Sequence, residues 1–505
     1  MHLENSVEEE LEILIRARYP VLYVVSAEES RVIQCLEQIC SRRRKKLFEW
    51  SCTIGLVQGG ASLQSHKQRS QTTRDPLAAL EQIIDFVEPA IFVLKDFHSH
   101  IGKSSPNVIR RLKEIAGGLK GSFKTIVIVS PILELPVELE KEVTVLNFPP
   151  PGVAELGLVL DRVIEETKDL PDIRVCISPE SRIKLIQASM GLGISELENV
   201  FAKIIIKSKG FSDADLPEIL AEKKQLIRKS GLLEFYESPE SFSSVGGMAQ
   251  LKDWLQKRKA ALLPNAREFG LPAPKGVLLL GVQGCGKSLC AKAVSAEFQL
   301  PLLRFDMGRM FGSLMGSSEE NVRRAIALAE SIAPSILWVD EIDKAFTGIQ
   351  NHGASDGGTT ARVLGTFLTW LSEKQAAVFV VATANEVSHL PPELLRKGRL
   401  DEIFFVDLPS VDERKEILGI QLRKRRRDPE RFDLQLLAEK SEGLSGAEIE
   451  EAVISALFEA FSEEGDLENR HLLDVIHETV PLSRTMEEQI GNLRSWAKGR
   501  ARRAA

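Results

Sequence analysis

The chain has 505 residues, which is too long for one hydrophobic core and predicts about three compact domains. Its hydrophobic fraction of 43% and charged fraction of 27% are those of an ordinary globular protein, which excludes a disordered or fibrous chain. The net charge of -7 gives no overall attraction to nucleic acid or to an anionic membrane.

We expect no secretory signal in the first twenty residues, because they contain Glu4 and Glu8 to Glu10 and lack the basic start and continuous apolar stretch of such a signal. No apolar run reaches the length of about 18 residues that would span a membrane. The six cysteines are scattered without metal-ligand spacing and are interpreted as reduced thiols. These features predict a cytoplasmic protein.

The first half of the chain predicts an α/β module, with buried strands at Val21 to Val25 and Ile91 to Leu94. The second half predicts four more strands separated by helical patterns, and this alternation favours a parallel sheet. Those four strands are Val277 to Leu280, Leu302 to Phe305, Ile336 to Val339 and Val378 to Val381. After Pro409 the pattern is helical through Phe461, which predicts a small helical lid after the sheet.

Short motifs recur in the two halves and indicate two copies of one plan. Leu135 to Leu139 precedes a predicted strand in the first half, as Leu390 to Leu394 does in the second. Gly191 and Gly443 are each followed by leucine and, five residues on, by two glutamates separated by one residue. We therefore expect a sheet-plus-lid module in each half.

The repeat and the composition of the C-terminal segment together predict four domains. They are a degenerate module at 1–230, a large α/β subdomain at 231–409, a helical lid at 410–480 and a basic C-terminal helix or tail at 481–505. In the first module the loop Ser26 to Ser30 has neither the glycines nor the lysine that wrap a phosphate, and Phe97 is aligned with Glu341 of the second half. We expect the first module to be structural or to bind a partner.

A complete phosphate loop, G-x-x-x-x-G-K-[ST], begins at Gly281, directly after a predicted strand and before a helical pattern. Its backbone N–H groups and the start of the next helix favour the phosphates of ATP. Lys287 is expected to reach the β- and γ-phosphates, and the Ser288 hydroxyl to ligate Mg²⁺. The residues predicted to bind nucleotide here are Gly281, Val282, Gln283, Gly284, Cys285, Gly286, Lys287, Ser288 and Leu289.

Two carboxylates end the strand Ile336 to Val339, as in the Walker B element of ATPases. Asp340 is predicted to bind Mg²⁺, directly or through water. Glu341 is predicted to polarise the attacking water as a general base. Together with the phosphate loop, the pair predicts a P-loop ATPase with ATP and Mg²⁺ as ligands.

Residues 240 to 480 resemble an AAA ATPase domain. The resemblance rests on Val245 to Gly247, on Leu395 to Arg399 and on Gly443 to Glu448, besides the two motifs above. The whole chain is most similar to AAA proteins of cyanobacteria and algal plastids, so the compartment is the cytoplasm, or the plastid stroma for a plastid-encoded chain.

The resemblance also implies roles for single residues. Val245 and Gly246 help to line the adenine pocket, and Arg396 and Arg399 are arginine fingers that reach a neighbouring subunit's γ-phosphate. An arginine that completes a neighbour's site implies a homo-oligomeric ring, commonly a hexamer. The polar residue beside Walker B, known as sensor 1, is assigned to Asn385, with Thr383 as the second choice.

Two segments depart from the family's pattern. The pore stretch Leu314 to Ser317 has leucine where ring translocases carry an aromatic residue, and the family's Asp-Gly-Phe signalling segment is not recognisable in Phe367 to Lys374. A loop from Gly348 to Thr360 contains His352, which we interpret as a loop residue and not a metal ligand.

Three functions remain open from the sequence. The first is a ring ATPase that remodels an unidentified protein partner, with the first module as its recognition or assembly platform. The second is a nucleotide-dependent regulatory scaffold that does little mechanical work. The third, a nucleic-acid-associated ATPase, rests on the basic runs Arg42 to Lys46, Arg423 to Arg427 and Lys498 to Arg503; it is not favoured, because such runs are usually solvated faces or tails.

Overall fold

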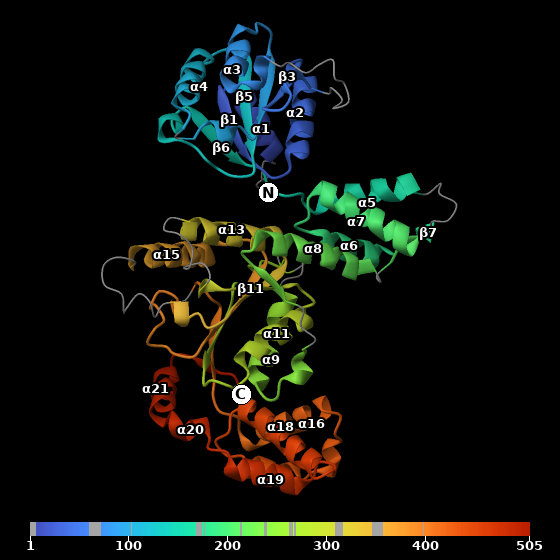
Figure 1. Ribbon diagram of the computed structural model, residues 1–505, viewed down its shortest axis with the longest axis vertical. Coiled ribbons are helices and arrows are strands. Elements are labelled where there is room, and N and C mark those ends of the chain that lie inside the picture. The colour runs from blue at the N-terminus through green and yellow to red at the C-terminus, as the bar shows by residue number, and fades with distance from the viewer. Residues whose placement is uncertain are drawn as a thin grey trace. The chain divides into compact units, whose positions relative to one another are not determined.

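The computed structural model describes residues 7–59, 72–102, 104–167, 174–175, 177–212, 215–236, 240–261, 266, 269–308, 317–345, 357–396 and 398–505. Packing divides the chain into two compact units. The first comprises residues 1–182 and 192–212, and the second comprises 183–191 and 213–505. Each unit contains a sheet made mainly of parallel strands, as the alternating pattern predicted (Figure 1).

The first unit is built on a six-stranded sheet in the order β3-β2-β4-β5-β1-β6. All neighbouring strands are parallel except β2 and β3. Most residues of the central strands β1, β4 and β5 are buried, as expected for a sheet covered on both faces. The strands are β1 (Val21–Val25), β2 (Lys46–Ser51), β3 (Gly55–Gln58), β4 (Ala90–Lys95), β5 (Lys124–Ser130) and β6 (Val143–Asn147).

Helices cover both faces of this sheet (Figure 1). One face packs on α1 (Val7–Arg16) and α2 (Glu29–Arg43), and the other on α3 (Pro76–Asp85) and α4 (Pro106–Gly118). The chain then becomes mainly helical. The elements that follow are α5 (Val153–Thr167), β7 (Arg174–Val175), α6 (Pro179–Ser189), α7 (Ile194–Ser208) and β8 (Gly210–Phe211).

The second unit is built on a seven-stranded sheet in the order β15-β14-β10-β13-β12-β11-β9. Only the pairing of β9 with β11 is antiparallel. The four strands predicted from the sequence are all present, as β10 to β13. The strands are β9 (Glu234–Tyr236), β10 (Gly276–Gly281), β11 (Leu302–Phe305), β12 (Ser335–Val339), β13 (Val378–Ala384), β14 (Glu402–Val406) and β15 (Arg502–Arg503).

Two hydrophobic clusters fill the space between this sheet and its helices. One face packs on α9 (Ala249–Ala260) and α11 (Lys287–Phe298) through Trp254 and Phe298, among others. The opposite face packs on α13 (Ser317–Ser331), α15 (Gly357–Glu373) and α21 (Glu487–Ala497). Because β10 leads directly into α11, the phosphate loop is held between two buried elements.

The expected helical lid follows β14 and has a core of its own. It consists of α16 (Val411–Lys424), α17 (Leu434–Lys440), α18 (Gly446–Ser462) and α19 (Asn469–Glu478). Two of these helices begin with capping boxes, formed by Ser410 with Glu413 and by Ser445 with Glu448. The boxes satisfy the first backbone N–H groups of α16 and α18, which both border the site described below.

The structure differs from the expected boundaries at one place. Helix α8 (Leu216–Ser230) and β9 pack with the second unit, because Ile227 and Leu233 belong to the core that contains Leu278. The sequence had placed the division at residue 230. The region expected as a basic C-terminal helix or tail contains α20 (Leu482–Thr485), α21 and the edge strand β15, which pairs with β14.

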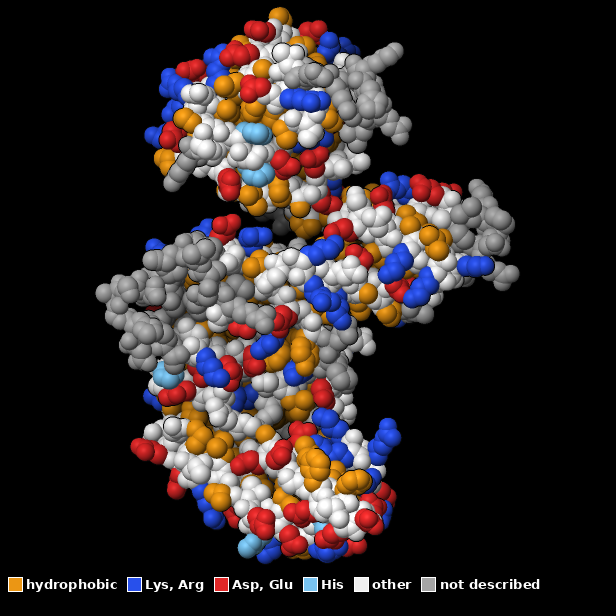
Figure 2. All heavy atoms as spheres, in the orientation of Figure 1, with side chains coloured by type: hydrophobic (Ala, Val, Ile, Leu, Met, Phe, Trp, Pro, Cys, Tyr) orange, Lys and Arg blue, Asp and Glu red, His pale blue; other side chains and the backbone are white. Residues whose placement is uncertain are grey.

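Two of the three basic runs, Arg42 to Lys46 and Arg423 to Arg427, are partly ion-paired within the described part of the chain. Arg42 and Arg43 both contact Glu12, Arg425 contacts Glu450 and Arg427 contacts Asp466. Over the face drawn in Figure 2, basic and acidic side chains are interspersed. This arrangement does not form the continuous basic stripe expected of a nucleic-acid-binding face. Among the described helices none has both the length and the apolar character needed to cross a membrane.

Candidate functional site

The phosphate loop forms the turn between β10 and α11 and requires glycine at specific positions. Gly281 has a φ of 154°, and a Cβ added there would lie 2.0 Å from the carbonyl oxygen of Val406. Gly284 has a φ of 74°, and its Cβ would lie 2.8 Å from the Ser445 hydroxyl. Only glycine satisfies both the backbone conformation and the close approach. The loop is therefore held against β14 on one side and against the lid on the other.

Lys287 is the first residue of α11 and is buried, with 5% of its surface exposed. Its ammonium donates hydrogen bonds to the carbonyl oxygens of Gly281 at 2.8 Å and Val282 at 2.7 Å. Burial lowers the pKa of Lys287 to about 8. A buried cation at a helix N-terminus is a binding element for phosphate.

The Asp340 carboxylate lies beside two hydroxyl groups. Its Oδ1 atom is 3.0 Å from the Ser288 Oγ atom and 2.6 Å from the Thr383 Oγ1 atom. Adjacent ligands of an octahedral Mg²⁺, each bound at about 2.1 Å, lie roughly 3.0 Å apart. The Ser288 and Asp340 oxygens have this spacing and this chemistry, so they fit Mg²⁺, whose remaining ligands would be phosphate oxygens and water. Within the described residues no group of three or more His, Cys, Asp or Glu side chains is placed to hold a metal on its own.

Glu341 follows Asp340 and faces the cavity in an unusual backbone conformation, with a φ of 49°. Its N–H donates to the Thr383 Oγ1 atom at 2.9 Å, which fixes the turn. Its carboxylate accepts a hydrogen bond from the Asn385 side-chain amide at 3.4 Å and pairs with Lys344 at 2.6 Å. Asn385 therefore contacts the proposed general base, whereas Thr383 contacts the proposed metal ligand.

A cavity of about 1150 Å³ joins the phosphate loop to the lid. The N–H of Ala447, in the first turn of α18, donates to the Gly284 carbonyl oxygen at 2.9 Å, so the lid touches the loop directly. At the other end of the cavity, Gly246 approaches Ile417 of α16 so closely that a Cβ would lie 2.6 Å from the Ile417 side chain. The volume and the mixed polar and apolar lining fit a nucleotide.

The structure brings most of the predicted residues to this cavity. Those that line it are Val245, Gly246, Gln283, Gly284, Cys285, Gly286, Lys287, Ser288, Leu289, Glu341 and Asn385. Arg396 and Arg399 do not line it; Arg396 is exposed, and the Arg399 Nη1 atom is buried without a hydrogen-bond partner. The pore stretch Leu314 to Gly316 and His352 lie outside the described residues.

Sequence reasoning missed part of the cavity wall. Glu413, Ile417, Ile420 and Gln421 all line the cavity from α16. Glu413, Ile417 and Ile420 are spaced three to four residues apart, so they lie on one face of a helix. The sequence itself contains this spacing, which could have indicated a helix face at the site. Asp407 lines the cavity as well, and no local pattern indicates it.

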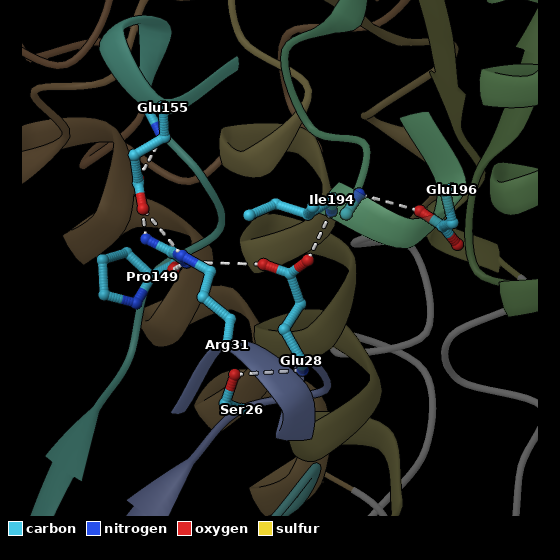
Figure 3. Close-up of polar contacts among 9 residues, drawn as sticks. Ser26, Glu28, Arg31, Pro149, Glu155, Ile194 and Glu196 are labelled. Atoms are coloured by element: carbon cyan, nitrogen blue, oxygen red, sulfur yellow. Dashed lines mark hydrogen bonds and ion pairs between the residues drawn. The ribbon is translucent and has the colours of Figure 1, made fainter. Parts of the chain in front are cut away.

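The corresponding loop of the first module is occupied by its own side chains (Figure 3). Glu28, at the start of α2, points to α7, where its Oε1 atom accepts a hydrogen bond from the Ile194 N–H at 2.6 Å. Arg31 pairs with Glu155 of α5 at 2.7 Å and also donates to the Pro149 carbonyl oxygen. The side chains of this loop and of the first turn of α2 are therefore engaged with α5, α7 and the Pro149 carbonyl oxygen.

The alignment of Phe97 with Glu341 was wrong by one residue. Asp96 has a φ of 50°, nearly the 49° of Glu341, and Phe97 is fully buried like Ile342. Lys95 then corresponds to Asp340, and it pairs with Glu29 at 2.9 Å and Glu49 at 2.8 Å. The first module retains a carboxylate at the position of Glu341 but has an ammonium at the position of Asp340.

A phosphate loop on a parallel sheet, a Walker B carboxylate pair and a helical lid that contacts the loop together define the AAA class of ATPases. The family described as ATPase family associated with various cellular activities (AAA) matches residues 277–408. The N-terminal domain of SpoVK-like AAA ATPases matches residues 7–148, and their second domain matches 154–230. The AAA-like first half inferred from the repeats is thus confirmed.

Within that class the chain belongs to the family of AAA domain-containing proteins called ycf46. It is 41% identical to the uncharacterized ycf46 protein of Guillardia theta over 496 residues, which is 97% of this chain and 95% of that protein. It is 40% identical to the ycf46 protein of Gracilaria tenuistipitata var. liui over 505 residues, 99% of this chain and 100% of that protein. A proteasome-activating nucleotidase of Aeropyrum pernix is 35% identical over 234 residues, 45% of this chain and 57% of that protein.

Proposed function

We propose that this protein binds Mg²⁺ and ATP in the cavity between phosphate loop and lid, hydrolyses ATP, and uses the cycle to remodel a protein partner in a homo-oligomeric ring. The observation that carries the proposal is the 3.0 Å contact between Ser288 and Asp340 directly beside the buried ammonium of Lys287. The three groups, two from the first turn of α11 and one directly after β12, provide a metal-binding oxygen pair and a phosphate-binding cation.

Each residue has a distinct task in this proposal. Lys287 and the loop N–H groups bind the phosphates, while Ser288 and Asp340 would hold Mg²⁺. Bound Mg²⁺ neutralises charge on the β- and γ-phosphates. Glu341 accepts the proton of the attacking water, and Asn385 orients the Glu341 carboxylate. Because Ala447 of the lid bonds to Gly284 of the loop, a change at the phosphates reaches the lid through a single hydrogen bond.

Two features support mechanical work over a static scaffold. The lid belongs to the same cavity as the reacting groups, so closing on nucleotide would move α16 and α18. Arg396 and Arg399 do not line the chain's own cavity, and Arg396 is exposed, which leaves Arg396 available to a neighbouring copy. The proteasome-activating nucleotidase among the relatives also supports a protein partner.

The test is ATP hydrolysis by the full chain and by Glu341→Gln, with Glu386→Gln as the matched control. Glu386 is a nearby carboxylate that pairs with His389 and does not line the cavity. We expect Glu341→Gln to bind ATP normally and to lose roughly two or more orders of magnitude in kcat, the scale of general-base catalysis. Equal activity of the two variants would refute the role of Glu341. Turnover per subunit that does not change with protein concentration, by a wild-type chain demonstrated to be a monomer, would refute the ring.

A further inference from the structure

A carboxylate that no nucleotide-binding pattern indicates forms part of the cavity wall. Asp407 follows β14 and lines the cavity. The carbonyl oxygen of the preceding residue, Val406, accepts a hydrogen bond from the Val282 N–H of the phosphate loop at 3.0 Å. Burial, with a smaller contribution from the Asp407 carboxylate, raises the pKa of Cys285 in the same loop to about 12. Because Asp407 lines the same cavity as the phosphate loop, its negative charge would repel a polyphosphate ligand.

Arg494 binds that carboxylate from α21. Its Nε atom is 3.0 Å from both carboxylate oxygens of Asp407, and its Nη2 atom is 2.8 Å from Oδ1. The hydrogen bond to Asp407 raises the pKa of Arg494, so the guanidinium stays charged. A bidentate contact of this kind holds the Arg494 and Asp407 side chains in one geometry.

The segment that carries Arg494 is anchored at both ends. Leu493 and Ala497 of α21 pack into the core beneath the sheet, and β15 pairs with β14, the strand that leads into Asp407. The Leu482 N–H, at the start of α20, donates to the Glu448 Oε1 atom at 2.7 Å, so the segment also touches the capping box of α18. Arg494 is therefore held in place beside the cavity and does not belong to a free tail.

We propose that Arg494 is a positioning residue for the phosphates of the nucleotide, acting through Asp407. Its guanidinium cancels the carboxylate's charge, so that the wall next to the phosphate loop does not repel a polyphosphate anion. The inference rests on the proposed function, because it concerns the same cavity. It extends the site to a segment 87 residues away from Asp407 in the sequence.

The test compares the affinities of AMP, ADP and ATP for the full chain, each measured in competition with a fluorescent ATP analogue. In Arg494→Ala the ATP affinity should fall roughly three- to tenfold, the ADP affinity less, and the AMP affinity by less than about twofold, because repulsion grows with phosphate charge. Adding Asp407→Asn to Arg494→Ala should restore ATP affinity to within about twofold of wild type. Arg500→Ala is the control, since the Arg500 guanidinium donates to the Trp496 carbonyl oxygen of its own segment.

Measuring the affinity loss at several salt concentrations distinguishes an effect of charge from a packing defect. The Arg494 and Asp407 side chains are 50% and 40% exposed, so the loss in Arg494→Ala should shrink as ionic strength rises. An equal loss for AMP, ADP and ATP, or a loss that Asp407→Asn does not reverse, would overturn the proposal and indicate a purely structural role. If the wild-type chain binds none of the three nucleotides, the proposed function itself fails, which is a distinguishable result.

Discussion

The Glu28 carboxylate accepts a hydrogen bond from the Ile194 N–H at 2.6 Å, and thereby joins the first loop of the N-terminal module to the start of α7. The second half makes the corresponding link between Gly284 and Ala447, at 2.9 Å, with backbone atoms alone. In the second half the link uses only a carbonyl oxygen of the loop, and in the first module it uses a side chain. The link in the first module therefore does not require a nucleotide.

Replacing Glu28 by alanine should loosen α7 without affecting ATP hydrolysis. The substitution leaves the Ile194 N–H without its acceptor, and the loss of such a cap costs about 1 kcal/mol. Hydrogen exchange at the first turn of α7 should accelerate by about fivefold. Glu29→Gln is the control, because Glu29 pairs with Lys95 and does not contact α7. Protection of α7 that changes when ATP is added to wild type would show that the first module responds to nucleotide.

ATP affinity should depend on pH through Lys287. Burial lowers the pKa of Lys287 from 10.5 to about 8, so the folded chain without nucleotide releases this proton earlier than the unfolded chain does. This group's contribution to stability therefore increases with pH between those two values. ATP needs the charged ammonium, so its affinity should fall by up to about tenfold per pH unit above about pH 8.

Titration calorimetry at pH values on both sides of the Lys287 pKa, in buffers of different ionisation enthalpy, measures this dependence. Proton uptake on ATP binding is the expected signature above that pKa. Lys287→Met should bind ATP weakly at every pH and show no uptake assignable to this residue. A wild-type affinity that stays constant across the range would mean that the Lys287 ammonium does not bind phosphate.

Thr383 and Asn385 should affect different steps. Thr383→Val removes the hydroxyl that donates to Asp340 at 2.6 Å and accepts the Glu341 N–H at 2.9 Å, so the Mg²⁺ concentration needed for half-maximal activity should rise. Asn385→Ala removes only the contact with the Glu341 carboxylate, so kcat should fall by about tenfold with ATP affinity nearly unchanged. Ser388→Ala is a nearby control. If the two variants had the same kinetic profile, the separate assignments would be wrong.

If Arg396 and Arg399 are arginine fingers, mixtures of two inactive variants should show activity. Arg396→Ala or Arg399→Ala should reduce turnover with ATP binding nearly intact, because a finger stabilises charge in the transition state. Glu341→Gln protein lacks turnover but keeps both arginines. Mixing it with an arginine variant should restore some activity if the fingers act across an interface between copies. Mixtures no more active than their separate components would place the arginines' role within their own chain.

The phosphate loop and the Walker B pair could be predicted from the sequence because each is a local motif. A strand, a short loop and a helix lie within a few consecutive residues, and the backbone geometry follows from the glycines at 281, 284 and 286. The lid was predicted from the continuous helical pattern after Pro409, which is also a local signal. These features depend on neighbours in the chain, so residue types at fixed spacing are sufficient to predict them.

Only the tertiary structure decided the contacts between distant segments. Asp407 and Arg494 are 87 residues apart, and Glu28 and Ile194 are 166 residues apart. Asp96 corresponds to Glu341 by its positive φ and by the burial of the residue after it, and the residue types alone do not reveal either property. Whether a charged side chain lies beside a cavity depends on which strands and helices pack together. That packing is determined by the hydrophobic core of each unit as a whole.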